Sequence, residues 1–186
     1  DPAAVFVYGT LLRRESRAGV WRRHRIDRAR LASTEGTLHA TDDDYPVMTL
    51  GGAARGRVLG DLIEPRDLGA LLPELDAIEE YDPAGADGNL FVRTVVSVQV
   101  GAEVVPAWTY VCGDTLAPGP VIASGDWRTH LGRREGFLAA LAQCYRQAGA
   151  ADPWAPGLPL QQALAEGRVD EAALARELRL AAPLCD

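Results

Sequence analysis

The chain has 186 residues, of which 47% are hydrophobic and 24% charged, a composition typical of a single globular domain. Its formal net charge of −7 argues against a protein that coats nucleic acid. No apolar run reaches the roughly 18 residues of a membrane-spanning helix, so we expect no membrane contact.

All 19 basic residues are arginines, and the absence of lysine excludes a mechanism based on a Schiff-base lysine or a phosphate-loop lysine. The three cysteines are odd in number and widely spaced, which fits a reducing cytoplasm better than a disulfide framework. The bias towards alanine, arginine, glycine and proline is typical of a bacterial genome rich in G and C. We therefore expect a cytoplasmic bacterial protein.

The first predicted element is a buried strand within residues 4–12, AVFVYGTLL. Five apolar or aromatic residues run directly into Gly9 and Thr10. A glycine at that point marks a place where the backbone turns or is approached closely. The free backbone N–H groups of such a strand end serve either as simple punctuation or as an anion site.

Residues 13–30 contain eight arginines and few apolar positions, which predicts a partly ordered connector instead of an amphipathic helix. The plain interpretation is a solvated segment that pairs with the many Asp and Glu residues. Nucleic-acid binding is the weaker interpretation, because Trp21 is nearly the only aromatic residue there and the whole chain is acidic. A third interpretation is that some of these arginines steer an anionic substrate.

The middle of the chain has three clear patterns. Alternation of apolar and polar residues predicts a strand over 55–64. Leucines and an isoleucine spaced by three and four predict a helix over 67–80. Residues 91–100 and 104–111 are rich in β-formers and are separated by a short turn, which predicts a hairpin.

The C-terminal part is predicted to be helical. A helical pattern covers residues 127–148, and two shorter ones cover 160–166 and 169–180. The order of strands, one helix, a hairpin and then helices favours the α+β class over alternating βαβ units.

The usual catalytic and metal-binding motifs are absent from the sequence. It has no nucleophile-elbow serine, no dinucleotide-binding glycine pattern and no P-loop. The three histidines lie far apart and no Cys-x-x-Cys pair occurs, so no metal site is predicted. What remains is a carboxylate cluster over residues 74–82, which is either a solvated helix end or a site where one carboxyl pKa rises toward neutrality.

Several short motifs follow one another along the chain. They are VFVYGTL (5–11), YP (45–46), GDL (60–62), LDAIE (75–79), FVR (91–93), AWTYV (107–111) and IASGDW (122–127). In this order they resemble the motifs of the γ-glutamylcyclotransferase (AIG2-like) family. The opening VFVYGTL resembles the family's F-V-Y-G-[ST]-L, and LDAIE matches its L-D-x-x-E. The resemblance covers roughly residues 4–131.

The resemblance implies a small mixed β-barrel with flanking helices and one cavity, within the α+β class. Closing a sheet into a barrel removes its exposed edges, and the mouth of a barrel is a common ligand site. The barrel domain would comprise residues 1–132. Residues 133–186 would form a helical extension packed on the same domain.

The resemblance also implies a reaction that needs no cofactor or metal. The α-amine of a γ-glutamyl group attacks its own γ-amide carbonyl, which forms 5-oxoproline and releases a free amine. Glu79 would be the general acid and base, and the Tyr8–Leu11 loop would bind the glutamyl carboxylate through its N–H groups. The implied substrate-binding residues are Tyr8, Gly9, Thr10, Leu11 and Tyr110.

Two departures from the family pattern leave alternatives open. The family often has glycine directly after the glutamate, whereas this chain has Glu80, which is therefore a second candidate base. The loop over residues 82–89 and the long tail suggest an altered cavity rim and hence a different leaving amine. The candidate substrates are glutathione-type dipeptides, γ-glutamyl amines from protein crosslinks and γ-glutamyl-protected intermediates such as those of aminoglycoside side chains. The alternative function is a non-catalytic protein of the same fold that binds a small ligand.

Overall fold

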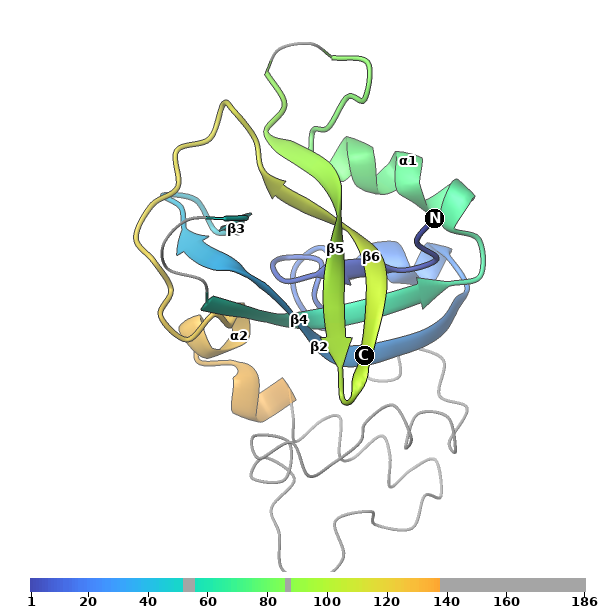
Figure 1. The fold of residues 1–186 in the computed structure, drawn as a ribbon, viewed down its shortest axis with the longest axis horizontal. Coiled ribbons are helices and arrows are strands. Elements are labelled where there is room, and N and C mark those ends of the chain that lie inside the picture. The colour runs from blue at the N-terminus through green and yellow to red at the C-terminus, as the bar shows by residue number, and fades with distance from the viewer. Residues whose placement is uncertain (52–55, 86–87, 138–186) are drawn as a thin grey trace, which may run out of the picture.

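The structure is a computed structural model that describes residues 1–51, 56–85 and 88–137. Six strands form its centre, with one longer helix and shorter helical segments around them (Figure 1). The strands are β1 (Val5–Val7), β2 (Ile26–Ala40), β3 (Pro46–Thr49), β4 (Gly56–Pro65), β5 (Phe91–Val100) and β6 (Glu103–Cys112). The helices are the 3-10 helix η1 (Ala18–Arg23), α1 (Leu68–Ile78) and α2 (Trp127–His130).

The strands form a closed barrel of mixed direction, as the family resemblance implied. The order is β3-β2-β4-β1-β6-β5, and an additional pairing of β2 with β5 closes the ring. The pairing of β1 with β6 is parallel and joins Val5 to Trp108, whereas the other strand pairs are antiparallel. Because β3 pairs only with the end of β2, it lies outside the closed ring.

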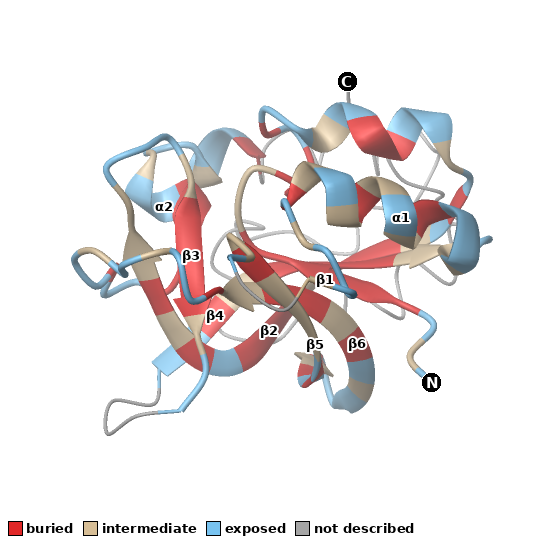
Figure 2. Cartoon of the chain, turned by 90° about the horizontal axis from the view of Figure 1, so that it is seen from above, coloured by how far each residue is buried: buried red, intermediate tan, exposed pale blue. Residues whose placement is uncertain are grey.

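The core lies inside the barrel and beneath α1 (Figure 2). All three residues of β1 are buried, which explains the unbroken apolar run in the sequence. The backbones of β1 and β4 approach so closely that a side chain at Gly60 would place its Cβ only 2.1 Å from the carbonyl oxygen of Val7. Glycine is therefore required at that position of β4.

The predicted strand over 55–64, the helix over 67–80 and the hairpin over 91–111 are confirmed as β4, α1 and β5–β6, with small shifts at their ends. At its start, α1 is capped by the Asp67 carboxylate, which accepts a hydrogen bond from the Ala70 N–H at 3.0 Å. Leu71 and Leu75 are its buried positions and face the barrel. None of the helices in the described ranges is long and apolar enough to span a membrane.

The expectation of a connector over residues 13–30 was wrong for most of that segment. It contains η1 and the beginning of β2, the longest strand of the barrel. Trp21 is buried, and its indole N–H donates to the carbonyl oxygen of Leu11 at 2.8 Å, which fixes η1 under the first loop. Arg30 on β2 is also buried and pairs with Glu64 at 3.1 Å, so a basic residue occupies a strand position.

The predicted helix over 127–148 is also wrong as a single element. The helix α2 ends at His130, and Gly132 follows with a positive φ of 67°, a conformation that stops a helix. Helical structure resumes over residues 134–137. The rest of that prediction, and the patterns over 160–166 and 169–180, lie outside the described residues.

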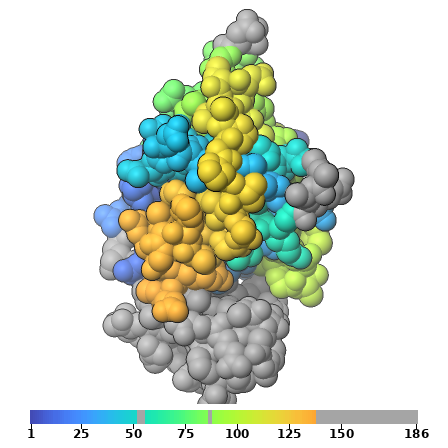
Figure 3. Space-filling model, turned by 90° about the vertical axis from the view of Figure 1, so that its left-hand side faces the viewer, coloured from blue at the N-terminus to red at the C-terminus, as the bar shows by residue number. Residues whose placement is uncertain are grey.

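The segment between β6 and α2 crosses the outside of β2 (Figure 3). The Ala40 N–H donates to the carbonyl oxygen of Pro120 at 2.9 Å, and the Ile122 N–H donates to that of Leu38 at 2.8 Å. This pairing brings the buried Trp127 and α2 against the barrel wall. The helix α2 thus lies at the same end of the molecule as the first loop, although the two are far apart in the sequence.

A buried ion-pair network at this end joins three segments. Asp61 of β4 is fully buried and accepts hydrogen bonds from the Arg13 side chain at 3.0 Å and the Arg128 side chain at 2.7 Å. The backbone N–H of Arg13 also donates to Asp61, at 3.0 Å. Burial by itself would raise the pKa of Asp61, but the two guanidinium groups outweigh it and hold that pKa well below its usual range.

We predict that Asp61→Asn lowers the free energy of unfolding by about 3–5 kcal/mol, because it leaves two buried arginines without their counter-ion. Urea unfolding at neutral pH measures the change. Asp27→Asn is the matched control, since the ion pair of Asp27 with Arg66 at 2.9 Å is about half exposed on both sides and should contribute less than about 1 kcal/mol. Equal effects of the two substitutions would contradict the structural role of Asp61.

Candidate functional site

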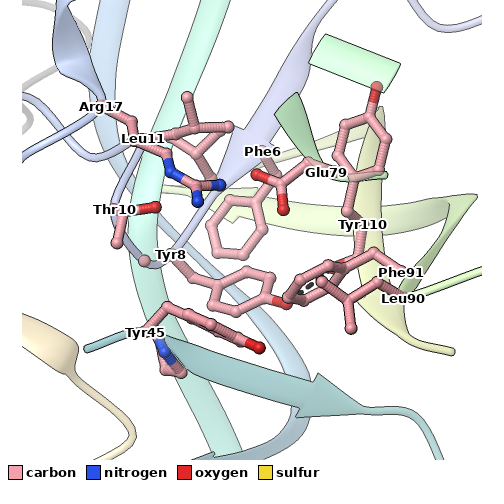
Figure 4. A pocket seen from close by; sticks show the side chains of 13 residues that line it. Phe6, Tyr8, Thr10, Leu11, Arg17, Tyr45, Glu79, Leu90, Phe91 and Tyr110 are labelled. Atoms are coloured by element: carbon pink, nitrogen blue, oxygen red, sulfur yellow. Dashed lines mark hydrogen bonds between the residues drawn. The ribbon is translucent and has the colours of Figure 1, made fainter. Parts of the chain in front are cut away.

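A cavity opens at the end of the barrel where β1 runs into the first loop (Figure 4). The space in the cavity, together with the open solvent at its mouth, is about 470 Å³, and its wall is mostly aromatic and apolar. The lining residues are Phe6, Val7, Tyr8, Gly9, Thr10, Leu11, Arg17, Tyr45, Pro46, Glu79, Leu90, Phe91 and Tyr110. All six site residues predicted from the sequence are among them.

The loop after β1 brings unpaired backbone donors to this cavity. Within the described ranges, the N–H groups of Gly9, Thr10 and Leu11 donate to no protein acceptor. The carbonyl groups do take part in bonds that hold the loop: that of Gly9 accepts from Leu12 at 3.0 Å, and that of Thr10 accepts from Arg17 at 2.8 Å. Successive free N–H groups in a fixed loop form a binding concavity for an anion.

Glycine is favoured at position 9 because the loop passes close to the start of β3. A Cβ there would lie 3.0 Å from both Cγ and Cδ of Pro46. Such a contact is tighter than ordinary packing, so a larger residue would displace the loop or the proline. The turn at Gly9 therefore allows the loop to approach Pro46 closely and also exposes the N–H groups of the loop.

Glu79 reaches the cavity from the C-terminal end of α1. Its backbone N–H donates to the carbonyl oxygen of Leu75 at 2.9 Å, which ends the helix. Glu80 then adopts a positive φ of 52°, and the N–H of Tyr81 closes the turn on the carbonyl oxygen of Asp76 at 2.9 Å. This turn leaves Glu79 buried, whereas Glu80 is exposed and does not line the cavity.

The surroundings of Glu79 favour its protonated form near neutral pH. Only 8% of the residue is exposed, and this burial raises its pKa to about 7. The positive charge of Arg17 acts in the opposite direction and lowers that pKa. Figure 4 shows the guanidinium of Arg17 and the carboxyl of Glu79 pointing toward one another across the cavity. A carboxyl group with a pKa near the working pH suits general acid–base catalysis.

The hydroxyl groups of the two tyrosines predicted to bind substrate are engaged within the protein. Tyr8 donates to the carbonyl oxygen of Tyr110 at 2.7 Å and accepts from the N–H of Met48 at 3.2 Å. Burial, together with the charge of Glu79, raises the pKa of Tyr8 well above its usual value. The hydroxyl of Tyr110 donates to Asp76 at 2.7 Å, outside the cavity, so its ring alone forms part of the wall.

Asp76 organises a second layer that sequence reasoning missed. Its carboxylate accepts from Arg93 at 2.6 Å and from Tyr110, which ties α1 to β5 and β6. The Arg93 guanidinium also lies over the rings of Tyr81 and Trp108, at 5.4 and 5.2 Å from their centroids. The signal was present in the quoted LDAIE and FVR motifs, in which Asp76 and Arg93 have fixed places.

Arg17 is a charged residue of the cavity wall that sequence reasoning did not single out. It was one of eight arginines in a segment without a clear period, and only the loop geometry brings this one to the cavity.

As for metals, the described residues contain no group of three or more His, Cys, Asp or Glu side chains that would hold an ion.

The family model described as gamma-glutamyl cyclotransferase, AIG2-like, matches residues 5–129. The chain belongs to this family. The matched region contains the whole cavity and the Asp61 network up to Arg128. A comparison with curated proteins finds none that matches the chain significantly.

The fold of this cyclotransferase-family chain is similar to those of YkqA and PH0828, two solved structures. YkqA from Bacillus subtilis has 20% identity and a TM-score of 0.55, and the alignment covers 73% of this chain and 43% of YkqA. PH0828 from Pyrococcus horikoshii has 17% identity and a TM-score of 0.52, with 72% and 97% covered. An AIG2-like protein from mouse has 25% identity and a TM-score of 0.49, with 62% and 80% covered. The chain thus spans less than half the length of YkqA.

We predict that Glu79→Gln changes the pH dependence of stability. The carboxyl has a pKa of about 7 in the folded protein and its ordinary value of 4.5 when unfolded. The wild type therefore loses stability as the pH rises from 4.5 to about 7, in total on the order of 3 kcal/mol, because the folded state holds its proton longer.

Glutamine never ionises, so the Glu79→Gln variant lacks this loss. Urea unfolding at about pH 4.5 and pH 8.5 should show the difference between wild type and Glu79→Gln shifting by about 3 kcal/mol in favour of the variant at the higher pH. The exposed Glu80 provides the control, since Glu80→Gln should leave the pH dependence nearly unchanged. A parallel course for wild type and Glu79→Gln would rule out a raised pKa.

Proposed function

We propose that this chain is a γ-glutamylcyclotransferase that converts a γ-glutamyl group into 5-oxoproline and releases a free amine. The observation that carries the proposal is a cavity lined both by the buried carboxyl of Glu79 and by a loop whose N–H groups at Gly9, Thr10 and Leu11 have no acceptor among the described residues. Membership of the family supports the same reaction. No cofactor enters the proposed chemistry.

The loop is proposed to bind the glutamyl α-carboxylate. A carboxylate accepts several N–H bonds at once, and hydrogen bonds to a charged group are stronger than neutral ones. The hydroxyl of Thr10 lies at the same face of the cavity and adds a further donor (Figure 4). With one end of the glutamyl group held there, its γ-amide extends toward Glu79.

Glu79 is proposed to act first as a base and then as an acid. Its carboxylate takes a proton from the α-ammonium, and the free amine attacks the γ-carbonyl carbon to form the ring C–N bond. Glu79 then passes this proton to the nitrogen of the scissile amide, whose C–N bond breaks with departure of a neutral amine. The ring nitrogen loses its second proton to Glu79, which returns it to the released amine. Two protons thus move in total from the α-nitrogen to the leaving nitrogen, and the final product is an ammonium ion.

The apolar wall favours ring closure over hydrolysis. Phe6, Tyr8 and Phe91 surround the reacting centre and exclude water, so the nearest nucleophile is the amine of the substrate itself. Folding the glutamyl chain into its cyclising conformer supplies much of the acceleration, because well-oriented intramolecular reactions have very high effective molarities. We expect the reaction to take place in the cytoplasm, in line with the low cysteine content.

We predict that Glu79→Gln lowers kcat/KM for 5-oxoproline release by about 10²–10⁴, the usual contribution of a general acid–base group. The assay follows 5-oxoproline by mass spectrometry from a panel of γ-glutamyl amino acids and γ-glutamyl amines. Glu80→Gln is the matched control and should retain nearly full activity, because Glu80 is exposed and outside the cavity.

Loss of activity in Glu80→Gln, with Glu79→Gln unaffected, would transfer the catalytic role to Glu80. Binding of γ-glutamyl compounds without release of 5-oxoproline by the wild type would instead favour the ligand-binding alternative. Calorimetry on the wild type distinguishes binding without turnover from no binding at all.

We predict that kcat/KM rises with pH through a transition near pH 7. Glu79 must be ionised to accept the first proton, and its pKa is raised to about 7 by burial. Initial rates at low substrate concentration between pH 5 and pH 9 measure the profile. An acidic limb near the ordinary carboxyl value of 4.5 would show that another group, or a solvated Glu79, controls the reaction.

A further inference from the structure

Arg17 lies at the boundary between the cavity and a second hollow on the surface. The second hollow is lined by Ser16, Arg17, Gly19, Val20, Arg23 and Ile78. Arg17 is common to both linings, and its Nη1 donates to the carbonyl oxygen of Ile78 at 3.0 Å. Because Ile78 directly precedes Glu79, this bond holds the guanidinium beside the catalytic candidate.

The positive charge of Arg17 is not balanced by an ion pair within the described ranges. Arg23, the other arginine of the second hollow, pairs with Glu74 on α1. No carboxylate is among the described residues that line this hollow. Glu79 opposes the charge of Arg17 from the cavity side, and no other carboxylate is among the described residues that line the two hollows. The side of the guanidinium toward the second hollow is therefore available to a ligand.

The part of the cavity wall around Tyr45 has the reverse charge. Tyr45 lies close to Asp43 and Glu80, which, after burial, are the main reasons that its pKa is raised. The charge of Arg17 lowers the same pKa. A ligand carboxylate is thus directed along the Arg17 side and away from the Tyr45 side.

We propose that Arg17 selects leaving amines that carry a carboxylate, so that the substrates are γ-glutamyl amino acids or γ-glutamyl peptides. This inference rests on the proposed function. The leaving nitrogen must lie against Glu79 to receive its proton, and the group attached to it then passes Arg17 toward the second hollow. The loop from Gly9 to Leu11 holds the glutamyl carboxylate, which leaves Arg17 for the carboxylate of the amine.

The same arrangement disfavours leaving amines with additional positive charge. A polyamine or an aminoglycoside side chain would bring its ammonium groups against the guanidinium of Arg17, in a hollow whose described lining has no carboxylate. Like charges at such short range repel, and specificity often depends on the repulsion as much as on the attraction. The chain should therefore discriminate by the charge of the amine more than by its size.

The test uses two substrates of nearly equal size that differ by one charge, γ-glutamyl-alanine and γ-glutamyl-alaninamide. We expect the wild type to prefer γ-glutamyl-alanine in kcat/KM by about tenfold to a hundredfold, the effect of one charge-assisted hydrogen bond. Arg17→Gln should bring this ratio close to one, mainly by loss on γ-glutamyl-alanine. Arg17→Lys keeps the charge and should retain part of the preference.

Arg25→Gln is the matched control, since Arg25 belongs to the same basic segment, its side chain is 71% exposed and it does not line either hollow. It should leave the preference unchanged. Equal rates of the wild type on both substrates would overturn the inference. An equal loss of both activities in Arg17→Gln would overturn it as well, because Arg17 would then serve the glutamyl end or the catalytic step.

Failure of the proposed function is recognised separately, by the absence of 5-oxoproline from every substrate. In that case the charge preference is measured as binding, with calorimetry of both compounds on the wild type and on Arg17→Gln. Tighter binding of γ-glutamyl-alanine that depends on Arg17 would support the selection of a carboxylate. Equal affinities would reject it.

Discussion

The buried carboxylate of Asp61 is the interaction on which the arrangement of the site depends. It accepts hydrogen bonds from Arg13 and Arg128, residues 115 positions apart in the sequence, and thereby joins β4, the first loop and α2. Arg128 in turn donates to the carbonyl oxygen of Arg13 at 3.1 Å, and its guanidinium lies 3.6 Å from the ring centre of Phe137. The loop with the free N–H groups is therefore held at its end by charges that cannot leave one another without exposure of an uncompensated ion.

Two buried carboxyl groups of the molecule illustrate how one chemical group serves two purposes. Asp61 has two guanidinium partners at hydrogen-bond distance, which keep it ionised despite complete burial. Glu79 is buried among aromatic and apolar side chains with Arg17 as its main opposing charge, and its pKa rises to about 7. The difference lies in the partners and not in the depth of burial. Asp61 thus stays ionised in its ion pairs, whereas Glu79 carries a proton that is available for exchange.

Sequence patterns predicted those elements of the fold that depend on residues close to one another in the chain. The strand β4, the helix α1 and the β5–β6 hairpin follow from alternation, from helical spacing and from a short turn. The beginning of β2 was missed because its buried positions include Arg30, whose burial depends on Glu64 of a strand distant in sequence. A helix was expected beyond His130 because a positive φ at Gly132 leaves no trace in the apolar spacing.

The candidate site was predictable to the extent that its residues lie in short motifs. Glu79 and the Tyr8–Leu11 loop came from the family resemblance, and both line one cavity. The position of Arg17 was not predictable, because it is defined by its bond to Ile78 on another element. Asp76 lies in a quoted motif, but its role depends on its bonds to Arg93 and Tyr110 of other strands, which the motif does not show. The residues of a motif can be recognised in the sequence more readily than the side chains on other elements that hold them in place.

The parallel pairing of Val5 with Trp108 has a consequence for how the protein comes into being. A strand at the N-terminus finds one of its neighbours only after more than a hundred further residues have been made. Contacts of such large sequence separation form late and slow the folding of a domain. The first loop and Glu79 therefore cannot form a complete cavity on a nascent chain that lacks β6. The cavity is thus complete only once β6 has joined the barrel and supplied Tyr110 to its wall.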